Sequence, residues 1–275
     1  MAKRYEELSF TDDFMFCKIL ELHPELCREL LELILGRSVG ELALVNRQKP
    51  VEATPDGHGV RFDVYVKDGE NTIYDVEMQN ANVDSIPKRS RYSQSMIDMD
   101  QFERGAKYSE LCQSYVIFIC RFNLFPKIGL HKYTFLNLCK EKPQVELGDG
   151  TEKIYLCAKG TAEDVSENMK AFLQFIATGN SESRFTEKLK SAVETAKYQN
   201  QWRRDYMNLL ELNAIEREEG RKEGREEGRE EGREEGILHI LRSLVDEGIL
   251  NIEEAAKRAD MSVDVFRQKM TEEKE

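Results

Sequence analysis

Long apolar segments are missing from this chain of 275 residues. No apolar run approaches the roughly 20 residues that a helix needs to span a bilayer. The first ten residues, MAKRYEELSF, contain no apolar core of the signal-peptide kind. We therefore expect a protein without a membrane partner and with a cytoplasmic location.

Closely paired cysteines are missing as well. The chain has six cysteines, and no two of them form a C-x-x-C motif. Four lie inside apolar runs, such as YVIFIC and IYLC. Zinc sites and disulfide frameworks are recognised by regular cysteine spacing. We therefore interpret these cysteines as reduced, buried thiols.

An excess of positive charge is the third missing feature. Lysine and arginine total 40 against 52 aspartates and glutamates, which gives a formal net charge of −12. This balance argues against a protein that holds nucleic acid by overall attraction. The charge is uneven, with −7 on residues 216–275 and −5 on residues 1–215. The net charge does not exclude a local basic patch on residues 1–215.

Helical and strand patterns are both present in the first 215 residues. Two leucine-rich helical patterns, TDDFMFCKILEL and PELCRELLELIL, precede apolar strand runs such as ELALVN, SYVIFICRF and KIYLCAKG. A basic helical pattern begins at Pro87, and more helices follow from about Thr161 to Ile215. We predict an α/β (α+β mixed) domain over residues 1–215, in which helices flank a mixed sheet.

The composition changes abruptly at Glu216. The segment 216–236, EREEGRKEGREEGREEGREEG, has a glycine at every fourth position. Each glycine inside a helix costs about 0.5–1 kcal/mol relative to alanine, so we predict a marginal, solvated linker helix. A small helical segment over residues 237–275 should follow it. The repeat is either a spacer or, with the tail, a contact through which two or more chains form a homo-oligomer.

The stretch RFDVYVKDGENTIYDVEMQ, residues 61–79, has the pattern of a β-hairpin. Two alternating apolar runs flank a polar turn. Residues two apart in a strand point to the same face. Asp75, Glu77 and Gln79 therefore share one face of the second strand, and Asp63 lies on the first strand.

The register of this hairpin decides whether the carboxylates meet. Pairing Val66 with Thr72 leaves a five-residue loop and puts Asp63 opposite Asp75. A two-residue turn at Asp68-Gly69, which local propensity favours, would put Asp63 on the opposite face. A metal site requires the longer loop or a bulge.

Carboxylates that converge on one point suit Mg²⁺, whose other positions are held by water and a substrate phosphate. Such an ion lowers the pKa of a bound water and stabilises charge on phosphoryl oxygens. Gln79 cannot titrate, but it can orient water or a phosphate. Lys88, Arg89 and Arg91 begin the next helix and add cations for phosphate binding. Carboxylates on a wet strand face are also common without a metal.

A series of segments, in this order, resembles the recombination-promoting nucleases, a transposase-like family within the PD-(D/E)xK nuclease superfamily. The segments are LSFTDDFMFCKIL, PELCRELLELILG, GVRFDVYV, YDVEMQ, PKRSRYSQSMID, YVIFICRFNLF, YTFLNLC, LGDGTEKIYLCAKG and EEGREEGREEG. Together they cover most of residues 8–236. The resemblance implies a restriction-endonuclease-like fold and hydrolysis of DNA phosphodiester bonds with Mg²⁺, or with Mn²⁺ or Ca²⁺.

The resemblance also assigns site residues. Asp63 matches the strand aspartate of the family, and Glu77 matches the acid of its E-x-Q signature; both are implied metal ligands. Gln79 stands where the wider superfamily usually has lysine, so Lys88 or Arg89 could supply that charge. Each of the three hairpin residues is an implied catalytic residue.

An acid from the first helix often completes the site in this superfamily. Asp13 is the candidate here. It is also an ordinary acid for the first turn of a helix, where it stabilises the helix dipole, and both interpretations stay open.

Two functions fit these observations. The first is a DNA endonuclease associated with recombination or mobile elements. The second is a catalytically weak DNA-binding or assembly protein of a mobile element. Intact Asp63, Glu77 and Gln79 favour the first, because a decayed site should have lost one of them. The acidic tail, residues 237–275, favours a bundle that contacts protein over one that binds DNA.

Overall fold

The computed structural model describes residues 3–51, 60–82, 85–102 and 105–272. The chain forms two compact units, residues 1–206 and residues 207–275. No helix within the described ranges is long and apolar enough to cross a lipid bilayer. The expected cellular location stays a prediction.

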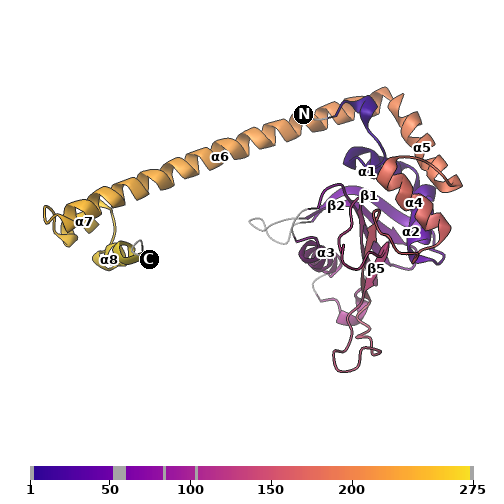
Figure 1. Ribbon diagram of the computed structural model, residues 1–275, viewed down its shortest axis with the longest axis horizontal. Coiled ribbons are helices and arrows are strands. Elements are labelled where there is room, and N and C mark those ends of the chain that lie inside the picture. Colours follow the sequence, from indigo (N-terminus) through magenta and orange to yellow (C-terminus); the bar gives the residue numbers. More distant parts are fainter. Residues whose placement is uncertain (1–2, 52–59, 83–84, 103–104, 273–275) are drawn as a thin grey trace. The chain divides into compact units, whose positions relative to one another are not determined.

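The first unit is built on one six-stranded mixed sheet (Figure 1). Its strands are β1 (Leu42–Val51), β2 (Val60–Asp68), β3 (Ile73–Gln79), β4 (Ser114–Cys120), β5 (Lys132–Phe135) and β6 (Thr151–Cys157). They lie in the order β1-β2-β3-β4-β6-β5. β1, β2 and β3 form an antiparallel meander, β3, β4 and β6 run parallel, and β5 is antiparallel to β6.

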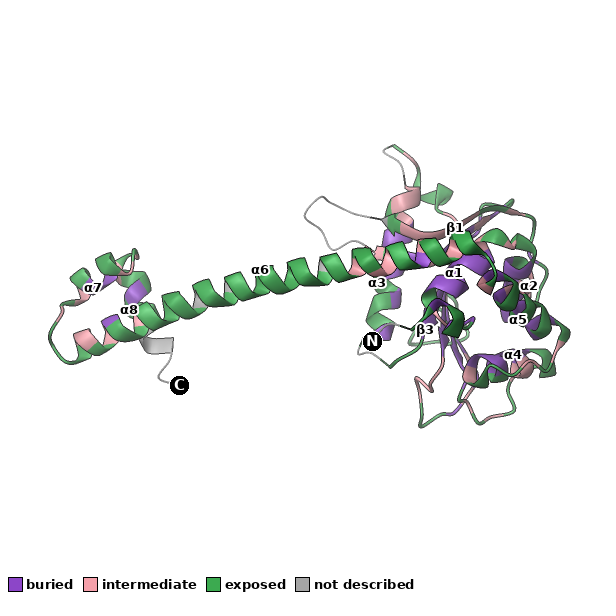
Figure 2. Cartoon of the chain, turned by 90° about the horizontal axis from the view of Figure 1, so that it is seen from above, coloured by how far each residue is buried: buried purple, intermediate pink, exposed green. Residues whose placement is uncertain are grey.

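Helices cover both faces of this sheet (Figures 1 and 2). α3 (Ile86–Gln101) joins β3 to β4 and lies on one face, as a parallel crossover requires. α1 (Asp13–Leu22), α2 (Pro24–Leu35) and α4 (Glu167–Thr178) lie on the other face, and α5 (Arg184–Lys197) packs against α2 and α4. The predicted mixed α/β fold, with helices flanking a mixed sheet, is confirmed.

The contacts of α3 position its basic residues. Ile86, Met96 and Ile97 pack against Phe118 and Tyr155 of the sheet. Burying side chains of this size stabilises the fold by about 1.5–3 kcal/mol each. The packing holds the first turn of α3 beside the end of β3.

The contacts of α1 position the other side of the site. α1 lies over β1 and β2. Arg47 of β1 donates a hydrogen bond of 2.7 Å to Glu21, and Lys18 forms an ion pair with Asp205. The Arg47–Glu21 hydrogen bond fixes α1 to β1, which pairs with β2, the strand that carries Asp63. The unit also contains two short 3₁₀ helices, Tyr5–Glu7 and Tyr108–Glu110, and the first residues of α6.

The hairpin adopts neither of the two registers considered from the sequence, but it does keep a five-residue loop, residues 68–72, because Lys67 pairs with Ile73. Val66 pairs with Tyr74, not with Thr72. The shift keeps the alternation of faces, because it is an even number of residues. Continuing this register places Asp63 opposite Glu77 rather than opposite Asp75.

The loop between the strands explains this register. Asp68 accepts hydrogen bonds from the backbone N–H groups of Glu70 and Thr72 at 3.0 and 2.9 Å. Asn71 has a φ of 68°, and its N–H donates to the carbonyl of Asp68 at 3.1 Å. Asparagine tolerates this left-handed conformation better than most residues. The positive φ therefore falls at Asn71, and a two-residue Asp-Gly turn does not form.

Helices are the only regular elements of the second unit within the described residues. Its elements are α6 (Asn200–Asp246) from Met207 onward, α7 (Ile252–Arg258) and α8 (Val263–Glu272). A small core contains Leu241, Ala255, Ala256 and Phe266. The glycine repeat is helical and lies inside α6, and its described side chains are exposed (Figure 2). Both predicted boundaries, after residues 215 and 236, fall within this one helix, so the three-part division stays a prediction.

Truncation tests which part of α6 belongs to the first unit. A chain that ends at residue 215 should fold with a melting temperature close to that of the full chain. A chain that ends at residue 199 should melt lower, because it loses the Lys18–Asp205 ion pair and Tyr206, which packs against Tyr5 and Phe14. Circular dichroism melting curves of both chains check this. Failure of the longer chain to fold would contradict it.

Candidate metal centre

The centre lies at a fork where β2 and β3 separate. Their paired register runs as far as Val64 and Val76. Beyond that pair, the backbone N–H of Asp63 donates to Oε1 of Glu77 at 3.1 Å. The backbone N–H of Met78 donates to Oδ2 of Asp63 at 3.0 Å. These two bonds hold both carboxylates in the gap between the strands.

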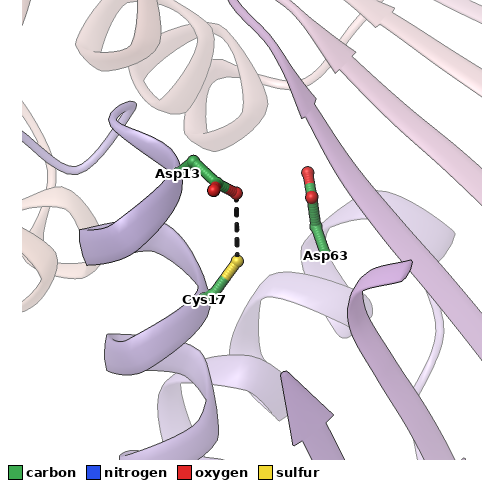
Figure 3. A group of neighbouring side chains, drawn as sticks. All are labelled: Asp13, Cys17 and Asp63. Atoms are coloured by element: carbon green, nitrogen blue, oxygen red, sulfur yellow. Dashed lines mark hydrogen bonds between the residues drawn. The ribbon is translucent and has the colours of Figure 1, made fainter. Parts of the chain in front are cut away.

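α1 closes one side of this gap. Asp13 and Cys17 are four residues apart, so they lie on the same face of the helix. The Cys17 thiol donates to Oδ1 of Asp13 at 3.4 Å. One ligand atom from each of Asp13, Cys17 and Asp63 lies within 4.8 Å of the other two, and the three side chains point toward one another (Figure 3). Asp13 is therefore both a first-turn residue of α1 and a neighbour of the strand aspartate.

α3 approaches the centre with an arginine. Nη1 of Arg89 donates to Oε1 of Gln79 at 3.0 Å, and Nη2 lies 3.5 Å from Oε2 of Glu77. The guanidinium also lies over the ring of Phe118. Gln79 thus orients a cation that faces Glu77.

A surface pocket of about 390 Å³ opens beside Glu77. Lys88 and Arg89 line it, together with Arg61 from β2. Arg91 is exposed and is not among the described residues that line this pocket. Two of the three predicted phosphate-binding cations therefore lie beside the centre, and the third lies outside the pocket.

Burial and mutual repulsion raise the pKa values of several acidic groups in the centre. Burial, and then the charges of Glu77 and Asp13, raise the pKa of Asp63 to about 8. Burial also raises the pKa of Glu77, against the opposing effects of the Asp63 N–H and of Arg89. Burial and the charge of Asp13 raise the pKa of the Cys17 thiol. Without a metal ion, the centre must therefore keep some of these groups protonated. A bound cation would allow them to ionise.

Asp75 adds a further buried carboxylate. Its side chain is fully buried, and among the described residues neither of its oxygens has a hydrogen-bond partner. Burial, and then the charges of Glu77 and Asp63, raise its pKa well above the usual range. Asp75 was recognised from its strand face, but no role was predicted for it.

These donors fit a divalent cation. Carboxylate oxygens are the ligands that Mg²⁺, Mn²⁺ and Ca²⁺ prefer, and the centre has more of them than its hydrogen-bond donors satisfy. Cys17 was not predicted to belong to the centre, because its sequence pattern indicated one more buried thiol. Of the six cysteines, all free, four are buried and two are half-buried. The i, i+4 spacing from Asp13 was the signal that could have identified Cys17.

The raised pKa of Asp63 predicts how metal-free stability depends on pH. The folded chain keeps this proton up to about pH 8, whereas the unfolded chain releases it near pH 4. The folded state therefore binds more protons between these values, and its stability falls as pH rises. We expect the melting temperature in EDTA to fall less for Asp63→Asn than for the wild type between about pH 5 and pH 8. An equal fall in both proteins would contradict this assignment.

Comparison with protein families identifies the family of the chain. The sequence model of the family described as PD-(D/E)XK nuclease family transposase matches residues 11–222, which include every strand and every residue of the centre. Comparisons with curated proteins and with solved structures gave no match. The family description indicates a DNA-binding nuclease associated with mobile elements, and the sheet flanked by helices agrees with a restriction-endonuclease-like fold. The chain belongs to the PD-(D/E)XK nuclease transposase family.

Proposed function

We propose that this protein is a divalent-metal-dependent DNA endonuclease that hydrolyses phosphodiester bonds, associated with recombination or mobile elements. One observation carries the proposal. Asp63 and Glu77, from neighbouring strands, each accept a backbone N–H of the other strand and share one gap. These two carboxylates are the proposed ligands of one cation. The cluster whose ligand atoms lie within 4.8 Å of one another contains Asp63 with Asp13 and Cys17 and does not include Glu77, so the Glu77 carboxylate would have to move toward the ion.

Asp63 and Glu77 are the proposed ligands, and Asp13 is the proposed accessory acid. Mg²⁺ is the expected cofactor, with Mn²⁺ and Ca²⁺ as alternatives. Such an ion would lower the pKa of a bound water and neutralise charge on the phosphoryl oxygens. The chain itself holds the carboxylates and orients Arg89 of α3.

Arg89 is the residue to which we assign the charge of the missing lysine. Its guanidinium is fixed by Gln79 and lies beside Glu77. Arginine presents several donors in a rigid fork that matches phosphate oxygens, and it stays protonated. Arg89 therefore binds and polarises the phosphate and takes no part in proton transfer. Lys88 lines the same pocket and adds charge for the DNA backbone.

Oligomer formation through the C-terminal repeat and tail is a further part of the proposal. A Cβ atom added to any of the five repeat glycines (Gly220, Gly224, Gly228, Gly232, Gly236) would meet nothing within 4 Å, so another helix could approach closely there. The chain that ends at residue 215 provides the comparison. It should be a monomer by light scattering where the full chain self-associates.

Alanine substitution tests the metal ligands. Plasmid DNA is incubated with the purified full chain and Mg²⁺, Mn²⁺ or Ca²⁺. Asp63→Ala and Glu77→Ala should each lower the cleavage rate by about 100-fold or more, the range for removal of one preorganised electrostatic group. Their melting temperatures in EDTA should stay unchanged or rise, because removing one carboxylate relieves repulsion.

Glu70→Ala is the matched control, since Glu70 is an exposed carboxylate in the loop of the same hairpin. It should cut at the wild-type rate. If Asp63→Ala also cuts at that rate, the nuclease proposal fails. A folded wild type that binds DNA but never cuts it would instead favour the catalytically weak DNA-binding or assembly protein.

A rescue experiment tests the assignment of Arg89. Arg89→Ala should lower cleavage strongly, because it removes the cation beside Glu77. Adding Gln79→Lys to this variant should restore part of the rate, since an ammonium then stands where the superfamily usually has lysine. In the chain that keeps Arg89, Gln79→Lys should raise the cleavage rate less than it does in Arg89→Ala, because it places a second cation about 3 Å from the guanidinium. Absence of any rescue in a folded double variant would contradict the assignment.

A further inference from the structure

Cys17 occupies a setting that packing alone does not require. Its side chain is fully buried, yet its sulfur faces carboxylates. The thiol lies 3.4 Å from Oδ1 of Asp13. Sulfur and one carboxylate oxygen each from Asp13 and Asp63 lie within 4.8 Å of one another (Figure 3). A buried cysteine ordinarily fills apolar space, and this one lies against the charged lining of the fork.

A second observation concerns a buried carboxylate beside this cluster. Asp75 is fully buried, and its two oxygens have no hydrogen-bond partner among the described residues. It shares its strand face with Glu77, two residues away, and the charges of Glu77 and Asp63 both act on it. A buried carboxylate without a partner is costly. A cation in the fork, where Asp63 and Glu77 lie, would offset part of that cost.

We propose that Cys17 is a ligand of this centre, so that the centre takes thiophilic divalent cations such as Cd²⁺ and Zn²⁺ through Asp13, Cys17 and Asp63. The inference rests on the proposed metal centre and specifies which class of ion it binds most tightly. The metal–sulfur bond forms as the thiol releases its proton to solvent. Mg²⁺ gains little from sulfur because it prefers oxygen ligands. Thiophilic ions should therefore compete with Mg²⁺ for this position.

Cadmium binding tests the sulfur ligand directly. The full chain, reduced and freed of metal, is titrated with Cd²⁺. Binding is followed by calorimetry and by the ultraviolet charge-transfer band of a cadmium–thiolate bond. We expect this band to saturate at one ion per chain. Cys17→Ser should abolish the band and weaken Cd²⁺ binding about tenfold or more, while Mn²⁺ binding changes far less.

Matched variants test the two half-buried thiols and separate this inference from the proposed function. Cys112→Ser and Cys139→Ser change half-buried cysteines outside the centre and should keep the band. Cys17→Ala replaces Cys17→Ser if the serine variant does not fold. Asp63→Asn should weaken both Cd²⁺ and Mn²⁺ binding.

Three outcomes are decisive. A band and an affinity for Cd²⁺ that survive loss of Cys17 overturn the inference. If Mn²⁺ binding depends on Asp63 but the wild type shows no cadmium–thiolate band, the inference fails and the proposed metal centre stands. If binding of neither ion depends on Asp63, the proposed metal centre itself fails, and the inference falls with it.

Discussion

Two hydrogen bonds between side chains and backbone, from the Asp63 N–H to Glu77 and from the Met78 N–H to Asp63, determine where this site forms. Buried backbone N–H groups must be paired, and here carboxylates pair them where the sheet ladder ends. The same bonds hold the carboxylates in the fork between β2 and β3. α1 and α3 then approach that fork with Asp13 and Arg89.

The charge balance of the fork links its structure to its proposed chemistry. Burying carboxylates together is unfavourable unless protons, donors or cations compensate them. Arg89 compensates part of the charge of Glu77, but Asp75 lies buried without a partner among the described residues. The structure therefore maintains a strained electrostatic arrangement that a divalent ion would relieve. Groups with strongly shifted pKa values cluster at functional sites, and this supports the proposed metal centre.

Much of this site could be predicted from residue alternation. A period of two placed Glu77 and Gln79 on one strand face, and Arg89 lay close by because it starts the next helix. The register could not be predicted, because it depends on Asn71 adopting a positive φ while Asp68 binds two backbone N–H groups.

The contact of Cys17 with Asp63 was also out of reach. It joins two elements 46 positions apart in the sequence, and only the packing of α1 over β2 brings them together. Periodicity describes each element and says little about which helix covers which strand. The identity of the fold class, by contrast, followed from the alternation of helical and strand patterns and from the ordered resemblance of its segments.

The proposed chemistry requires that Asp63 and Glu77 share one metal ion. A crystal of the full chain soaked in Mn²⁺, measured at a wavelength where manganese scatters anomalously, would locate that ion. We predict an anomalous peak in the fork, within coordination distance of carboxylate oxygens of both residues. Peaks found only outside the fork, with the Asp63 and Glu77 side chains still bound to backbone N–H groups alone, would contradict the shared site.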